Sequence, residues 1–268
     1  MTATSLTDQE FLQFQRLLYE IAGIYMTPAK KPLICGRLAR RLRHHNLSTY
    51  GEYYRLITSG QDAGELQIAI DLLTTNETYF FREPQHFDFL RDYAATTYRR
   101  GHQFRVWSAA CSSGEEPYSI AMVLDAHLRD GVWEVVGSDV STRVLEKART
   151  GLYPIEQAKR IPKPFLQRYC LKGIGSHEGT LLVNKQLRNQ VQFMQINLNE
   201  PLPRLGTFNV IFLRNVMIYF DADTKRKVLS RLIPLLASGG YLLIGHSESL
   251  NGLDVPLIAE RPSIYRKP

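Results

Sequence analysis

The chain has 268 residues, and its 44% hydrophobic and 22% charged content is typical of a globular protein with a sizeable core. No apolar run reaches the ~18 residues that a membrane-spanning helix needs, and the first residues lack the basic and then apolar pattern of a secretion signal. The three cysteines are an odd number without a C-x-x-C spacing. They predict free thiols in a reducing cytoplasm rather than disulfides or a zinc site.

The net charge of +7 first suggests nucleic acid or another acidic partner. The charge is unevenly placed, because residues 1–90 hold 9 Lys or Arg against 10 Asp or Glu and the remainder holds 24 against 16. Inside the near-neutral first part, residues 30–43 hold basic residues and no acid: Lys30, Lys31, Arg37, Arg40, Arg41 and Arg43. Such a run is either a solvated face or a docking surface for an acidic partner.

The first 75 residues predict a compact helical module. Thr7 and Glu10 form a capping box at the start of a helix over 5–25, which Gly23 ends. Three more apolar stripes with helical spacing predict helices over 32–45, 50–58 and 65–73. The module is followed by a linker, LLTTNETYFFRE, and then by a helix over 84–98. The linker is either a ligand-binding turn or a capped helix start with aromatic packing.

Residues 104–120, FRVWSAACSSGEEPYSI, predict a buried strand, a turn of small residues and a helix with Pro117 in its first turn. This pattern makes a ligand crevice at the carboxyl end of a parallel sheet. Glu115 and Glu116 would repel a pyrophosphate, so a cationic, hydroxyl-rich ligand such as S-adenosylmethionine fits better. The alternative is an ordinary turn with surface glutamates.

Asp139 follows a second strand, 133–137, and lies 25 residues beyond Gly114. An acidic residue about 20 positions after such a turn accepts the ribose hydroxyls in dinucleotide-binding folds. A carboxylate suits this role because it can accept from two adjacent hydroxyls. Asp139 is also a candidate N-cap for a helix over 144–149, and the two roles are compatible.

The remaining chain predicts further sheet elements. Residues 153–170 look irregular, and strands over 180–183 and 190–196 predict a small antiparallel hairpin lobe. A near-continuous apolar strand, 208–213, precedes a helix that Asp221 or Asp223 caps, and strands over 241–244 and 263–266 complete a doubly covered sheet. The histidines lack ligand spacing, so no metal is predicted, and the segment from His246 to Glu248 is interpreted as a loop.

Six segments together resemble the chemotaxis receptor methyltransferase (CheR) family of S-adenosylmethionine-dependent protein-glutamate O-methyltransferases: LLTTNETYFFRE, VWSAACSSGEEPYSIA, SDVS, INLN, FLRNVMIYF and SGGYLLIGHSES. The resemblance implies an α/β fold with a Rossmann-like class I methyltransferase domain over 99–268 and an N-terminal all-α helical domain over 1–75. It also implies that linker residues 76–98 contribute to the cofactor site and that a small antiparallel β-subdomain is inserted at about 171–196.

The resemblance also implies which residues contact the cofactor: Asn76, Thr78, Arg82, Glu116, Asp139, Asn197, Leu198, Arg214 and Asn215. One departure from class I methyltransferases is that the turn over 109–114 holds a single glycine, although its side chains are small enough for a ligand to approach the backbone. The motif favours Glu116 over Glu115, a choice that the residues by themselves leave open.

The implied reaction is a direct displacement, in which a receptor glutamate attacks the methyl carbon and S-adenosyl-L-homocysteine leaves. A free glutamate has a pKa of about 4.3, so this nucleophile is already ionised at neutral pH and needs no general base. We expect Arg82 and Tyr219 to act as the catalytic pair, with Arg82 orienting the carboxylate and Tyr219 fixing the angle of attack. Without the resemblance, Tyr219 reads as a core tyrosine after a buried strand.

The expected partner is the cytoplasmic helical domain of chemoreceptors, with Arg37, Arg40 and Arg41 docking against its acidic face. The inserted hairpin would be a second docking site, for a receptor C-terminal tail, and regulatory proteins are further possible partners. We expect a cytoplasmic protein recruited to receptor arrays, without nucleic-acid binding or membrane insertion. The alternatives are a methyltransferase of the same fold acting on RNA or a small molecule, and a scaffold that binds the cofactor without turnover.

Overall fold

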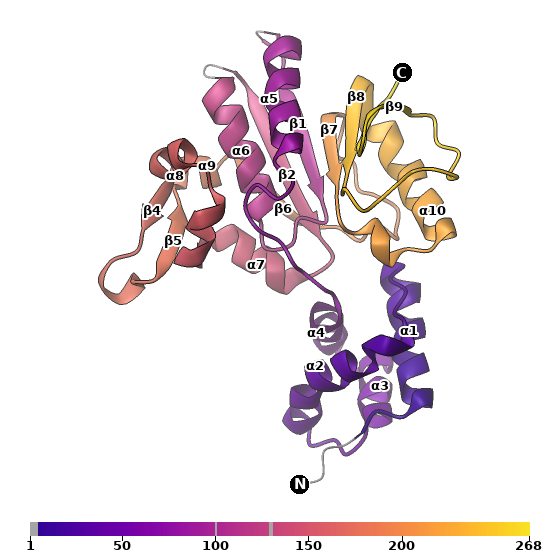
Figure 1. Cartoon of the computed structure of the whole chain (residues 1–268). Coiled ribbons are helices and arrows are strands. Elements are labelled where there is room, and N and C mark those ends of the chain that lie inside the picture. The colour runs from indigo at the N-terminus through magenta and orange to yellow at the C-terminus, as the bar shows by residue number, and fades with distance from the viewer. Residues whose placement is uncertain (1–4, 100, 129–130) are drawn as a thin grey trace.

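The computed structural model describes residues 5–99, 101–128 and 131–268, so residues 1–4 of the predicted helical domain lie outside it. Figure 1 shows a helical domain at the N-terminal end, a larger domain built around one sheet, and a small lobe beside that sheet. A linker, residues 74–84, crosses from the helical domain to the larger domain. No helix in the described ranges is long and apolar enough to cross a bilayer.

The helical domain has the four predicted helices, with a short 3₁₀ turn η1 (Pro28–Lys30) between the first two: α1 (Asp8–Ala22), α2 (Lys31–His44), α3 (Tyr50–Thr58) and α4 (Ala63–Leu73). The predicted capping box of Thr7 and Glu10 is present, and Gly23 ends α1 with a φ of 69°, a left-handed conformation that glycine adopts at low cost. The core includes Phe14, Leu38 and Tyr53, which are fully enclosed.

A buried ion pair inside this domain involves Arg41, one of the three predicted docking residues. Arg41 donates from Nε to Oε1 of Glu65 at 2.7 Å and also contacts the second oxygen, and Glu65 is only 2% exposed. Tyr53 donates to the same carboxylate at 2.6 Å. Arg41 therefore holds α2 against α4, and its guanidinium is occupied by a partner inside the domain. A buried acid needs a cationic partner, a requirement that the spacing of basic residues on one helix could not reveal.

The central sheet has the strand order β6-β2-β1-β7-β8-β10-β9. The five strands from β6 to β8 are parallel, while β10 and β9 are antiparallel additions at the edge. The strands are β1 (Phe104–Ala109), β2 (Trp133–Asp139), β6 (Val191–Gln195), β7 (Phe208–Leu213), β8 (Leu236–Ile244), β9 (Ile258–Arg261) and β10 (Ile264–Arg266). Strand β9 was not predicted, because all four of its residues are exposed and no apolar alternation marks it.

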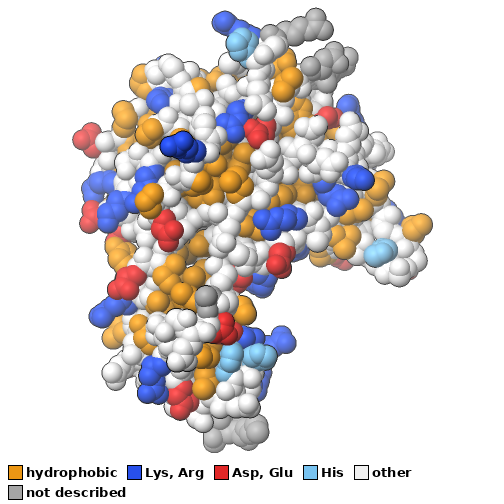
Figure 2. Space-filling view, turned by 180° about the vertical axis from the view of Figure 1, so that it is seen from behind, with side chains coloured by type: hydrophobic (Ala, Val, Ile, Leu, Met, Phe, Trp, Pro, Cys, Tyr) orange, Lys and Arg blue, Asp and Glu red, His pale blue; other side chains and the backbone are white. Residues whose placement is uncertain are grey.

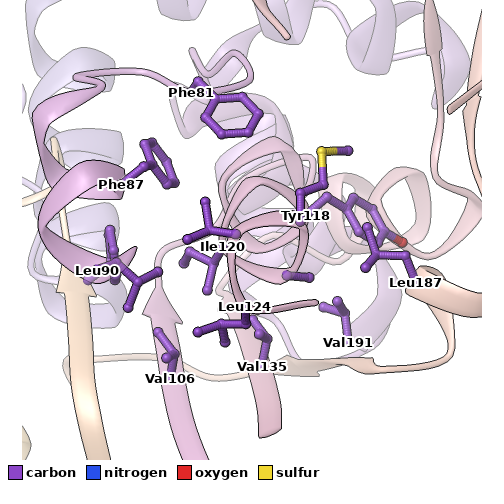
Figure 3. Packing of buried hydrophobic residues seen from close by; sticks show 14 of the residues in the cluster. Phe81, Phe87, Leu90, Val106, Tyr118, Ile120, Leu124, Val135, Leu187 and Val191 are labelled. Atoms are coloured by element: carbon purple, nitrogen blue, oxygen red, sulfur yellow. The ribbon is translucent and has the colours of Figure 1, made fainter. Parts of the chain in front are cut away.

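Helices cover both faces of this sheet. Helices α5 (Gln85–Thr97) and α6 (Glu115–His127) pack on one face, where Figure 3 shows Leu90 and Leu124 against Val106 and Val135 of the strands. The other face packs against α10 (Ala222–Leu232). Neighbouring residues of β7 alternate between the two cores, as Phe212 belongs to the first and Leu213 to the second. Helix α7 (Thr142–Thr150) follows β2.

The small lobe differs from the predicted hairpin. Its antiparallel sheet consists of β3 (Leu152–Pro154), β5 (Thr180–Val183) and β4 (Cys170–Lys172) in that order. Four short helices complete it: η2 (Ile155–Arg160), α8 (Lys163–Tyr169), η3 (Gly175–His177) and α9 (Lys185–Arg188). The insertion therefore spans about 152–188 instead of 171–196, and residues 153–170 are ordered elements.

The predicted strand over 190–196 belongs to the main sheet, since β6 pairs in parallel with β2 and buries Val191. Pairing there satisfies the backbone groups along β2, a long-range gain that local sequence does not indicate. After β7, the turn η4 (Met217–Tyr219) leads to Asp221, whose side chain caps α10 by accepting from Thr224. Pro234 lies in η5 (Ile233–Leu235), just after that helix.

We predict that Arg41→Gln lowers the free energy of unfolding by about 3 kcal/mol, because it leaves the buried Glu65 carboxylate without its cation. Urea unfolding followed by circular dichroism measures this, with exposed Arg40→Gln as the matched control. Burial alone would raise the pKa of Glu65, but Arg41, Tyr53 and His45 lower it to about 2. The ionised pair therefore stabilises the fold above about pH 4.5, and that contribution is lost as the pH falls toward 2. Equal losses for the two variants would contradict the assignment.

Candidate active site

A cavity of about 290 Å³ opens at the carboxyl ends of the parallel strands. The helical domain, the linker and the ends of β1, β2 and β7 all contribute to its wall. The cavity is lined by every residue that was predicted to contact a cofactor, namely Asn76, Thr78, Arg82, Glu116, Asp139, Asn197, Leu198, Arg214 and Asn215, and by the predicted catalytic residue Tyr219. Residues that are far apart in the chain thus face one space.

The turn after β1 brings backbone to the cavity. Ala110 and Ser112 have φ values of 82° and 50°, and Gly114 has a φ of 92°. A side chain at Gly114 would place its Cβ 2.8 Å from that of Ala148, so only glycine fits there. The small residues Ala110, Cys111 and Ser112 line the cavity, which leaves room for a ligand against the main chain. The single glycine of this turn, Gly114, is therefore required by the close packing against Ala148 of α7.

Asp139 lies at the end of β2 and is 6% exposed. Its carboxylate accepts from the backbone N–H groups of Ser112 at 2.9 Å and Ser141 at 3.0 Å. Burial raises the pKa of this carboxyl above its usual range. Because an ionised carboxylate has about four acceptor positions, these bonds leave acceptor capacity for a ligand hydroxyl. The predicted N-cap role of Asp139 is wrong, because Ser141 is the N-cap of α7 and the first N–H groups of that helix, those of Thr142 and Arg143, donate to Asp71.

The structure separates the two glutamates after the turn. Glu116 lines the cavity, and its two oxygens accept from the Ser108 hydroxyl at 2.6 Å and from Arg214 at 2.8 Å. Glu115 is 1% exposed and accepts from the Ser113 hydroxyl at 2.7 Å, away from the cavity lining. Burial raises the pKa of Glu115. The geometry therefore leaves Glu116 as the glutamate of this pair that a ligand can reach.

Arg214 is a buried cation between two carboxylates. It lies 2.8 Å from Glu116 and 2.9 Å from Glu83, and it donates to the backbone carbonyl of Arg82 at 2.5 Å. Although burial opposes the effect, Arg214 lowers the pKa of Glu83. This arrangement ties the end of the linker to the end of β7. Sequence analysis did not identify Glu83, although it ends the same FFRE motif as Arg82.

Glu83 also belongs to a cluster with His86 and His246, whose oxygen and nitrogen atoms all lie within 4.8 Å of one another. Sequence analysis overlooked this E-x-x-H spacing, although such a set of side chains can hold a metal ion. His86 is 1% exposed, and burial, with Arg214 nearby, lowers its pKa to about 3, so the ring is neutral at physiological pH. Glu83 already has a cationic partner in Arg214, so this cluster is part of the same ion-pair network.

Arg82 and Tyr219 contribute to the same cavity wall. Arg82 donates to the carbonyl of Glu77 at 3.1 Å, and its guanidinium lies 5.7 Å from the centre of the Tyr79 ring. Tyr219 ends η4 and is half-buried at the cavity, so it is not enclosed in the core. Burial raises the pKa of its hydroxyl, which stays protonated at neutral pH and can donate a hydrogen bond.

Glu248 was also missed, because it lies in the loop after β8. Its carboxylate accepts from the backbone N–H groups of Gly245 at 2.7 Å, Asn215 at 2.8 Å and Ile218 at 3.1 Å. Asn215 has a φ of 57°, a left-handed conformation that is unfavourable for most residues, and the hydrogen bonds to Glu248 stabilise this turn. Glu248 therefore fixes the segment that carries Asn215 and Tyr219.

The helical domain closes the cavity from the other side. Asn197 donates to the backbone carbonyl of Ile21 at 2.7 Å, which joins the end of α1 to the segment after β6. Tyr25, Met26 and Leu33 line the cavity, although sequence analysis assigned the domain only to docking. On α2, Arg37 donates to the carbonyls of Leu73 and Thr74 at 3.1 and 2.9 Å.

Comparison with known proteins agrees with this arrangement. The family model described as "CheR methyltransferase, SAM binding domain" matches residues 76–260, and "CheR methyltransferase, all-alpha domain" matches residues 9–74. Among curated relatives, the chain is 44% identical to "Chemotaxis protein methyltransferase" of Escherichia coli, over 97% of this chain and 91% of that protein. It is also 44% identical to the protein of the same name from Salmonella typhimurium, over 93% and 86% of the two chains.

A third relative, "Chemotaxis protein methyltransferase 2" of Pseudomonas aeruginosa, is 42% identical over 91% of this chain and 87% of its own. The two domain matches cover nearly all of the sequence, and their boundary falls in the linker that the structure shows between the helical domain and the sheet. The chain belongs to the CheR family of S-adenosylmethionine-binding chemotaxis methyltransferases.

Proposed function

We propose that the protein transfers the methyl group of S-adenosylmethionine to the side-chain carboxylates of glutamates on bacterial chemoreceptors. The products would be glutamate methyl esters and S-adenosyl-L-homocysteine. One observation carries the proposal: the same cavity is lined by the acids Asp139 and Glu116 and by Arg82 and Tyr219. The first two groups suit a donor with hydroxyl and cationic parts, and the last two suit an anionic acceptor.

The cavity residues fit the methyl donor. Asp139 has acceptor capacity left for a ribose hydroxyl, and the small turn over 110–112 lets the ligand lie against the main chain. Glu116 presents a carboxylate fixed by Ser108 and Arg214 to the cationic end. Ile196 and Leu198 give an apolar wall for the adenine. When bound, S-adenosylmethionine supplies an electrophilic methyl group on a positively charged sulfur.

The chain's task is then alignment of the acceptor. A glutamate side chain is ionised at neutral pH, since its ordinary pKa is about 4.3, so no residue has to remove a proton. In the proposed roles, Arg82 binds one carboxylate oxygen and Tyr219 donates to it, so that the other oxygen points at the methyl group. Good alignment can lower a barrier by ~7–11 kcal/mol. Neither contact should be so strong that it quenches the nucleophile.

Two surfaces support receptor docking. Arg40 and Arg43 are exposed on α2, close in sequence to Arg37, and would attract an acidic receptor face. In the small lobe, β4 is an edge strand with exposed apolar residues nearby, as Leu171 is 56% exposed and Ile174 is 82% exposed. An unpaired edge of this kind suits addition of a strand from a receptor C-terminal tail. Both contacts would recruit the protein to receptor arrays.

The decisive experiment incubates the full chain with S-adenosylmethionine labelled in its methyl group and a chemoreceptor cytoplasmic fragment. We expect label on glutamate that alkali releases as methanol, because esters hydrolyse where amides and N-methyl groups do not. A fragment with its acceptor glutamates replaced by glutamine is the control. Alkali-stable label, or equal label on RNA, would exclude glutamate ester formation as the main activity.

A matched pair of variants tests the cofactor assignment. We predict that Glu116→Gln raises the Kd for S-adenosylmethionine about tenfold, since it removes a charge at the cavity wall and a partner of Arg214. Glu115→Gln should leave the Kd within about twofold, because that side chain faces away from the cavity. Isothermal titration calorimetry measures both, and the reverse order of effects would move the assignment to Glu115.

Tyr219→Phe tests the proposed alignment. We expect kcat to fall about 10- to 100-fold, since one oriented hydrogen bond to the reacting carboxylate is lost, while the Kd for S-adenosylmethionine stays nearly constant. Single-turnover transfer to the receptor fragment isolates the chemical step. Full turnover with unchanged cofactor affinity would remove Tyr219 from the catalytic pair.

A further inference from the structure

A second recess adjoins the active-site cavity. Glu77 and Thr78 line both, so the recess and the cavity meet at this part of the linker. Its volume is about 560 Å³, and its far wall is η2 of the small lobe, which contributes Glu156, Lys159 and Arg160. Figure 2 shows Lys and Arg side chains around the hollow between the helical domain and the small lobe.

Tyr79 connects two arginines along this path. The Arg82 guanidinium lies 5.7 Å from the centre of the Tyr79 ring, and the Arg160 guanidinium lies 4.8 Å from the same centre. The two guanidinium carbons are therefore at most about 10.5 Å apart. Such cation–π contacts favour particular positions of a long side chain and lower the entropy lost when it binds a ligand.

Arg160 is available to a partner. It is exposed, and within the described part of the chain it forms no ion pair, as is also true of Lys159. Three cations, Arg82, Lys159 and Arg160, face the path from the cavity, against two acids, Glu77 and Glu156. Arg160 is the outer cation that an aromatic ring holds in place.

We propose that Arg160 binds a second carboxylate of the acceptor segment, one or two helical turns from the glutamate that reacts. This inference rests on the proposed function and names part of its substrate specificity. One turn of an α-helix advances ~5.4 Å, which lies inside the upper limit on the separation of the two guanidinium groups, and two turns advance ~10.8 Å, which is close to that limit. An acid at i+3, i+4 or i+7 from the reacting residue lies on the same helix face.

The chemistry favours arginine in both positions. At the neighbouring acid, which does not react, the Arg160 guanidinium can pair with both carboxylate oxygens through two parallel hydrogen bonds, whereas Arg82 binds only one oxygen of the reacting glutamate. With Arg82 at the reacting glutamate and Arg160 at its neighbour, the acceptor helix is held at two points and cannot rotate freely at the cavity mouth. The enzyme then prefers helices with paired acids over those with an isolated glutamate, and the preference appears mainly in KM.

The test uses the full chain with Arg160→Gln and two receptor cytoplasmic fragments. One fragment keeps the acids near the acceptor glutamate, and the other replaces those neighbours with glutamine. On the first fragment we expect KM to rise ~3- to 5-fold with kcat and the Kd for S-adenosylmethionine unchanged, as for an exposed charge pair. On the second fragment, Arg160→Gln should have the same KM as the unchanged enzyme.

Arg168→Gln is the matched control. Arg168 is exposed and also lies over a tyrosine, 5.2 Å from the centre of the Tyr169 ring, but it pairs with Asp125 outside the recess. Equal KM changes for the two variants would mean that only the net charge of the enzyme matters, and this would overturn the inference. A rise in KM for Arg160→Gln that persists on the neutralised fragment would also overturn it. No transfer by the unchanged enzyme to either fragment would instead overturn the proposed function, and the inference with it.

Discussion

The buried guanidinium of Arg214 is the contact on which the active-site geometry depends. It lies between Glu83 at the end of the linker and Glu116 at the start of α6, and it also binds the carbonyl of Arg82. A buried cation is stable only when its charge and donors are satisfied, so these partners cannot move apart without a large cost. The linker backbone at Arg82 and Glu83 is thereby fixed to the sheet.

The cavity is formed by three parts of the chain that such buried contacts hold together. The sheet supplies Asp139 and the small turn, the linker supplies Arg82, and the helical domain closes the remaining side through Tyr25 and Met26. Asn197 holds α1 to the segment after β6, and Glu248 holds the turn that carries Tyr219. Hydrogen bonds to backbone groups thus position the site, and this lets side chains facing the cavity remain available to ligands.

This architecture suits a reaction in which alignment is the main requirement. An ionised acceptor needs no base, and the cavity wall combines the acids Asp139 and Glu116 with the cation Arg82 and the phenol of Tyr219. Outside the cavity, exposed basic residues lie on α2 and on η2, at either side of the hollow between the helical domain and the small lobe. The net positive charge of the chain is consistent with the acidic receptor partner proposed above.

Local sequence determined much of this protein. The capping box of Thr7, the apolar stripes of α1 to α4 and the strand–turn–helix at residues 104–120 depend on interactions within a few residues, so their patterns predicted the elements closely. The ends of the first two strands also predicted that the small turn and Asp139 share one edge of the sheet, while the resemblance to a known family supplied the other cofactor residues.

Only the tertiary structure decided the features that depend on distant partners. The pairing of β6 with β2, the ion pair of Arg41 with Glu65, and the outward position of Glu116 relative to Glu115 all follow from burial and long-range contacts. The sequence places such residues on an element, but desolvation and pairing across the fold determine whether a side chain faces a ligand, solvent or a buried counter-charge.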